Sequence, residues 1–111
     1  MAMFRTMLVV LWLILAGYTA RVIATDGMGL LPIFFGDIAR LVWPGQFNLD
    51  FLCLLILSAT WTAWRDRFAM RGLLLAPVAL LGGAGFLLAY LLYLTIDARG
   101  DMRRVLLGSR A

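Results

Sequence analysis

Three long apolar runs, joined by short charged segments, constrain the fold of this chain more than any other feature. The runs cover residues 7–24, 48–64 and 72–96. A helix rises about 1.5 Å per residue, so the first run reaches roughly 27 Å, just enough to cross the hydrocarbon core of a bilayer. We therefore predict an all-α membrane protein with three transmembrane helices, forming one domain over residues 1–111.

The first run has an alternative interpretation as a secretory signal peptide. Arg5 precedes it, and Val22-Ile23-Ala24 would be a tolerable cleavage site. The rest of the chain is equally membrane-like, however, so a permanent anchor needs no extra assumption. We favour the anchor.

Composition supports a bilayer environment and excludes several classes of protein. Hydrophobic residues make up 64% of the chain and charged residues only 14%, against roughly 25% charged residues in soluble domains. A soluble domain of this size has too little interior to hide so many apolar side chains. A soluble enzyme, a disordered tail and a disulfide scaffold are therefore excluded, and the lipid bilayer is the expected partner.

The charged residues narrow the available chemistry. All of them are Arg or Asp, with no Lys, Glu or His. Without imidazole, and with Cys53 as the only thiol, the chain offers no metal site and no cofactor ligands, and the sequence leans against an enzyme. The arginines flank the apolar runs, where they suit anionic headgroups better than nucleic acid.

Between the first two runs, residues 31–43 predict a short amphipathic helix. Its apolar residues follow helical spacing, while Asp37 and Arg40 lie opposite, at positions i and i+3 where they can pair. The segment is too short and too polar to span, so we expect it to lie in the interface. A re-entrant helix is the alternative. We expect Trp43-Pro44-Gly45 to end it.

The third run carries a stripe of small residues, Gly72, Ala76, Ala79 and Gly83, at helical spacing. Such residues let helix backbones approach closely, so we predict a helix-packing face and leave open whether its partner is in the same chain. Pro77 predicts a kink in this helix. After it, the tail predicts a short surface helix through 101–107.

Four charged residues are candidates for binding a ligand or partner: Asp50, Asp37, Arg40 and Arg21. Asn48 is a plausible N-cap of the second run, which would place Asp50 in the first turn, where a carboxylate suits the helix dipole. A carboxylate near membrane depth is also often functional. Arg21 either reaches the headgroups or forms a buried pair with Asp50.

Membrane orientation is not decided by the arginines. Three spans would place four of them beyond each side of the membrane, while Arg21 and Arg40 lie in or near the interface. The positive-inside rule gives no clear direction for such a distribution, which motivates the hypothesis of mixed insertion.

Several segments together resemble a known family from Leu8 to Leu94. They read AGYTARVI, DGMGLLPIFFGDIARLVW, FNLDFLCLLILSATWTAW, RDRFAMR and AYLLYL. The GLLPIFF segment, Asp50 and the basic loop are the most specific parts. The chain resembles the small three-helix membrane proteins of bacteria and cyanobacteria in the domain-of-unknown-function family numbered two-eight-three-four. The resemblance implies a multi-pass protein of the bacterial inner membrane and implies no reaction.

Three functional hypotheses remain at this point. The first is a non-catalytic membrane protein that associates with itself or with a larger membrane complex through its helices. The second is a transporter or channel subunit that uses Asp50 as a membrane-embedded charge. The third is a small enzyme acting on a lipid or isoprenoid, with Asp50 or Asp37 as a general acid.

Overall fold

The computed structural model describes all residues 1–111 and consists of helices joined by short turns. In chain order the elements are α1 (Ala2–Asp26), α2 (Leu30–Ala39), α3 (Trp43–Arg65), α4 (Met70–Asp97), α5 (Met102–Leu107) and the 3-10 helix η1 (Gly108–Arg110). Helices α1, α3 and α4 are long and apolar enough to cross a membrane, and α2 is a shorter apolar helix between the first two. The predicted all-α class is confirmed, as is the short helix in the tail.

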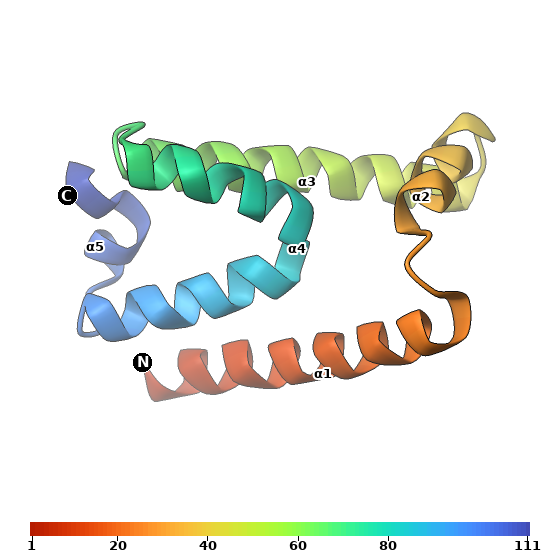
Figure 1. Cartoon of the computed structure of the whole chain (residues 1–111). Helices are drawn as coiled ribbons and strands as arrows, with labels where there is room; N and C mark the ends of the chain where they lie inside the picture. The colour runs from red at the N-terminus through yellow and green to blue at the C-terminus, as the bar shows by residue number, and fades with distance from the viewer.

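Helix α4 does not run straight, because it folds back on itself at Gly83 (Figure 1). Gly83 has φ 55° and ψ −139°, a backbone conformation that glycine adopts far more easily than other residues. Nη2 of Arg71 consequently lies 3.4 Å from the hydroxyl of Tyr93, although a straight helix would place these residues roughly 33 Å apart.

The break differs in position from the kink predicted at Pro77. Pro77 keeps helical geometry within α4, and Gly83 is the one residue of this helix with non-helical angles. The fixed φ of proline suits a helix, so its missing N–H and its ring can be accommodated by a modest bend. Reversing the chain direction needs a positive φ instead, and glycine supplies it at the smallest cost.

The two arms of α4 pack on different helices. On the first arm Gly72 lies against the backbone of Ala63 in α3. On the second arm the carbonyl of Gly85 accepts a hydrogen bond of 3.0 Å from Nε1 of Trp12 in α1. The folded α4 thus lies between α1 and α3 and holds them together over one half of the molecule (Figure 1).

The small packed core lies at the end of the molecule where α5 meets α4 (Figure 1). It consists of Tyr90, Leu94, Ala98 and Val105, with Trp61 and Phe86 among the partly buried side chains around it. Most other large apolar side chains are exposed, as expected for helices whose outer surfaces face lipid.

The α2–α3 junction corrects two predicted boundaries. Helix α2 ends at Ala39, and Trp43-Pro44 begins α3 instead of ending the preceding helix. Proline is well tolerated there because the first turn leaves its N–H groups without intrahelical partners. Asn48 therefore lies inside α3 and is no cap; its Nδ2 donates to the carbonyl of Phe34 at 3.1 Å and ties α3 to α2.

Candidate functional site

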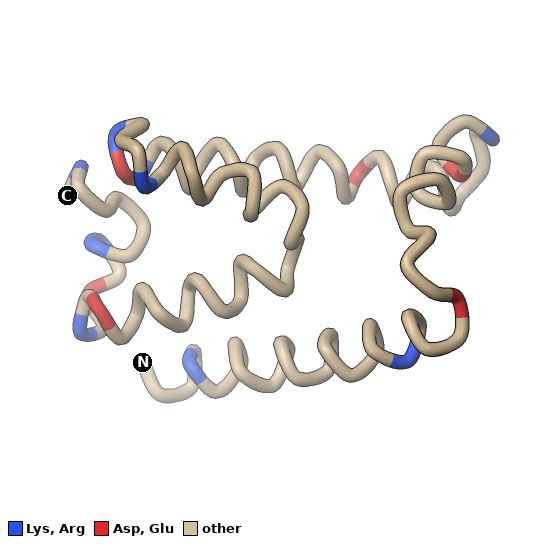
Figure 2. The backbone as a smooth tube through the Cα atoms, in the orientation of Figure 1, with Lys and Arg blue, Asp and Glu red and all other residues tan.

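The fold gathers most of the arginines at one end of the molecule. The start of α1, the end of α3, both ends of α4 and all of α5 meet there (Figure 1). Figure 2 shows the resulting concentration of positive charge. These eight residues are Arg5, Arg65, Arg67, Arg71, Arg99, Arg103, Arg104 and Arg110. We call this the Arg-rich end; only Arg21 and Arg40 lie toward the opposite end.

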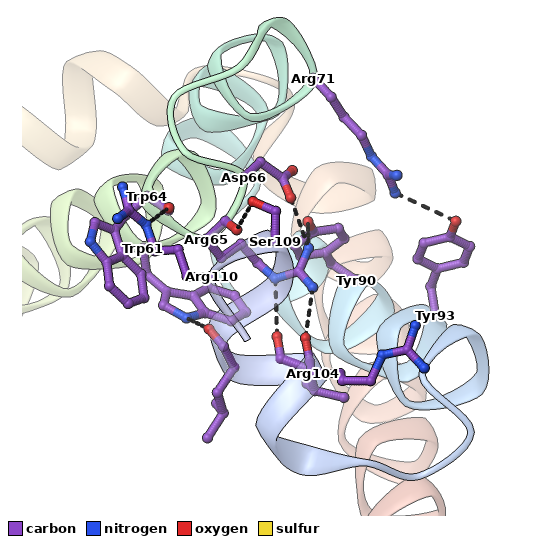
Figure 3. A network of polar contacts seen from close by, with 12 residues as sticks. Trp61, Trp64, Arg65, Asp66, Arg71, Tyr90, Tyr93, Arg104, Ser109 and Arg110 are labelled. Atoms are coloured by element: carbon purple, nitrogen blue, oxygen red, sulfur yellow. Dashed lines mark hydrogen bonds and ion pairs between the residues drawn. The ribbon is translucent and has the colours of Figure 1, made fainter.

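Arg65, the last residue of α3, is buried at the centre of this end (Figure 3). Its Nε donates to the carbonyl of Val105 at 3.0 Å, and Nη2 donates to the carbonyl of Arg104 at 3.1 Å. Nη1 reaches both the hydroxyl of Tyr90 at 3.1 Å and a carboxylate oxygen of Asp66 at 3.2 Å. One guanidinium thus fastens α5 to α3 and to the second arm of α4.

Further contacts hold the tail against the end of α3. The hydroxyl of Ser109 donates to the carbonyl of Arg65 at 3.1 Å, and Nε of Arg110 donates to the carbonyl of Trp64 at 2.6 Å. The guanidinium of Arg110 also stacks 4.6 Å from the ring centre of Trp64. Figure 3 shows these groups converging from α3, α4 and the C-terminal segment. The last carbonyls of α3, which have no intrahelical donors, are satisfied in this way.

Beside Arg65 lies a polar hollow of about 260 Å³. Its lining residues are Arg65, Asp66, Arg71, Leu94, Asp97, Ala98, Arg104, Gly108 and Ser109. The second carboxylate oxygen of Asp66 is buried there and accepts no hydrogen bond. The hollow therefore combines several cationic groups with one buried acceptor that lacks a donor.

Asp50 lies within α3, roughly two turns from its beginning. The side chain is exposed and makes no hydrogen bond or ion pair, since the chain's one ion pair joins Arg65 to Asp66. The ion pair between Arg21 and Asp50, one of the two alternatives for Arg21, is therefore not formed. The next residue, Phe51, contacts the turn of α4, and its Cζ lies 2.9 Å from the position that a Cβ on Gly83 would occupy.

Asp37 and Arg40 lie at the end of the molecule opposite the Arg-rich end. Asp37 is half-buried and Arg40 is exposed, and their side chains form no ion pair. The backbone N–H of Arg40 donates to the carbonyl of Asp37 at 3.2 Å, which is a helix-ending turn. Gly45 of α3 packs directly on the backbone of Asp37 and Ile38.

The predicted small-residue stripe packs inside the chain. Gly72, Ala79 and Gly83 are buried and Ala76 is half-buried. A Cβ added to Gly72 would meet Ala63 of α3, and a Cβ added to Gly83 would meet Phe51 of α3. The stripe therefore brings the first arm of α4 close to α3.

Sequence reasoning missed the role of Arg65. It follows Trp61 and Trp64 at the end of an apolar run, a pattern typical of an interfacial boundary. Its partners at residues 104 and 105 come about forty positions later. No local sequence pattern predicts this contact, because the end of α3 and the C-terminal segment come together only through the reversal of α4.

Comparison of the chain with protein-family models, with curated proteins and with solved structures found no match. The geometry of the chain itself therefore carries the functional argument.

Proposed function

We propose that this chain is a non-catalytic subunit of a membrane assembly and that it associates with another membrane helix through the face of α3 that carries Asp50. The observation that carries the proposal is Asp50 itself, an exposed carboxylate without a partner inside an apolar helix. The host membrane that fits the family resemblance is the bacterial inner membrane.

An unpaired carboxylate at membrane depth is costly, so such groups nearly always pair or face water. Asp50 is the eighth of the 23 residues of α3, and the next residue, Phe51, touches the turn of α4. Asp50 therefore lies roughly two turns inside this apolar helix. Since no cation of this chain pairs with it, we assign its partner to a second chain.

The neighbouring residues on this face of α3 support a contact with another helix. Phe47, three residues before Asp50, and Leu54 and Leu57, four and seven residues after it, lie on the same helix face and are strongly exposed. The small-residue stripe of α4, by contrast, is already used against α3. We therefore assign association to the outer face of α3, not to the stripe.

Substitution of Asp50 tests this assignment. Interhelical hydrogen bonds in membranes contribute about 1 kcal/mol, so Asp50→Leu should weaken association about fivefold. Asp50→Asn keeps hydrogen-bonding capacity and should retain most of it. Site-specific cross-linking in the native membrane, followed by quantification of the cross-linked species, measures the effect. Asp97→Asn at the Arg-rich end is the matched control and should behave like the wild type.

Association that is unchanged in Asp50→Leu would contradict the proposal.

A second candidate function, transport, is favoured by the same carboxylate because it can take up and release a proton or cation. In that case Asp50→Asn would abolish substrate flux in reconstituted vesicles while leaving the cross-linked species at its wild-type level.

A further inference from the structure

The two ends of the molecule differ strongly in charge. The Arg-rich end holds eight arginines and three aspartates, whereas the opposite end holds two arginines and two aspartates. Only Arg65 among the eight forms an ion pair within the chain. Five are exposed, namely Arg67, Arg71, Arg99, Arg103 and Arg104. The Arg-rich end thus presents uncompensated positive charge.

This charge lies where lipid headgroups would be. The apolar helices α1, α3 and α4 all begin or end here (Figure 1). Helix α5 packs through buried Val105 and leaves Met102 and Leu106 exposed beside Arg103 and Arg104. A short segment with apolar and arginine side chains together is typical of the boundary between headgroups and acyl chains.

The polar hollow adds specific chemistry to this charge. Arg71, near the start of α4, and Arg104, in α5, both line the hollow beside Arg65 (Figure 3). Their guanidinium groups suit a phosphodiester. The hollow also holds the carboxylates of Asp66 and Asp97, and one buried oxygen of Asp66 lacks a donor. A lipid headgroup with both a phosphate and a hydroxyl would match these groups, the phosphate pairing with the guanidinium groups and the hydroxyl donating to a carboxylate.

We propose that the Arg-rich end is a binding surface for anionic phospholipid, and that the hollow beside Arg65 receives a headgroup of the phosphatidylglycerol type. The phosphodiester lies against Arg71 and Arg104, and a glycerol hydroxyl donates to Asp66. Adjacent arginines attract the anionic leaflet as a whole. This inference is independent of the association proposed for Asp50, which lies in the apolar part of α3.

Native mass spectrometry of the full chain, with phosphatidylglycerol, phosphatidylethanolamine and phosphatidylcholine of equal chain length, tests the inference. The wild type should retain phosphatidylglycerol most strongly. The double variant Arg71→Gln/Arg104→Gln should lower this retention at least about fivefold, because each arginine near an anionic surface contributes substantially to binding. The matched control Arg21→Gln/Arg40→Gln removes two charges at the opposite end and should leave retention unchanged.

Each outcome decides the proposal. Equal retention of phosphatidylcholine, or equal or stronger retention of phosphatidylethanolamine, would overturn the anionic preference. An equal loss in both double variants would overturn the location. Thermal unfolding of the variants in detergent checks that they fold. Should Arg71→Gln/Arg104→Gln unfold, Arg99→Gln/Arg103→Gln takes its place, with a weaker loss expected and with unchanged retention counting against the surface.

Discussion

At the scale of single residues, Arg65 connects more of the structure than any other side chain. It is 7% exposed and donates to two backbone carbonyls of the C-terminal segment, to Tyr90 and to Asp66. Placing a guanidinium at a buried helix end is favourable only when its donors are satisfied and it meets free carbonyls. Both conditions hold here, which explains how so short a tail is held in place.

Arg65→Met removes these donors and keeps much of the side-chain volume. The carbonyls of Arg104 and Val105 lose their partner in a buried setting, so stability should fall by roughly 2–4 kcal/mol. Thermal unfolding in detergent measures this loss, and limited proteolysis should show earlier cleavage in the tail. Arg67→Met, at an exposed neighbouring position, should change stability by less than about 0.5 kcal/mol. Equal effects of the two substitutions would contradict the role given to Arg65.

At the scale of elements, the reversal of α4 organises the other helices. Its first arm packs on α3 and its second on α1, so the turn at Gly83 determines which residues meet. Tyr90 reaches Arg65 only because the second arm returns to the level of the end of α3. The apolar sequence of α4 is compatible with a straight span, and the glycine-rich stretch around Gly83 is what permits the reversal.

Gly83→Ala should destabilise the protein by about 1–3 kcal/mol, because alanine is strained at φ 55°. Its Cβ would also lie 2.9 Å from Cζ of Phe51. Gly85→Ala is the matched control: the nearest atom to its Cβ would be Cδ2 of Leu15, at 4.0 Å, and no loss is expected. Detergent unfolding curves compare the two variants. A Gly83→Ala protein as stable as the wild type would indicate that α4 extends through the position without a turn.

At the scale of the whole molecule, the folded α4 changes the expected membrane topology. Each arm is roughly 20 Å long, which is shorter than the roughly 30 Å hydrocarbon core. We therefore expect both arms to enter and leave the membrane on one side, with α1 and α3 crossing it. Eight arginines then lie on a single side, and the positive-inside rule favours one orientation with the Arg-rich end in the cytoplasm.

Thiol labelling in a Cys53→Ser background tests this topology. Cysteines introduced at Arg67 and at Ala111 should react with a membrane-impermeant reagent from the same side, and a cysteine at Gly29 from the opposite side. A straight α4 would separate the labels at Arg67 and Ala111, which contradicts the expectation. Labelling of every position from both sides would instead support the mixed insertion that the sequence motivated.

The amino-acid sequence alone predicts the all-α class, three helices long and apolar enough to cross a membrane, and the approximate positions of these helices. These follow from local properties, since apolar length and composition act within each segment. Asp50 was identified in the same way, by its residue type within an apolar run, although its helix begins at Trp43 and not near Asn48.

The places where the charges gather, and the surfaces that remain free, depend on the tertiary structure. Arg71 and Tyr93 meet because α4 reverses at Gly83, and Arg65 meets the carbonyls of Arg104 and Val105 for the same reason. The physical cause is that one residue with a positive φ redirects an entire helix arm, while the hydrophobic pattern on both sides of it stays unchanged. Contacts between distant segments depend on that direction, and hydrophobicity alone does not encode it.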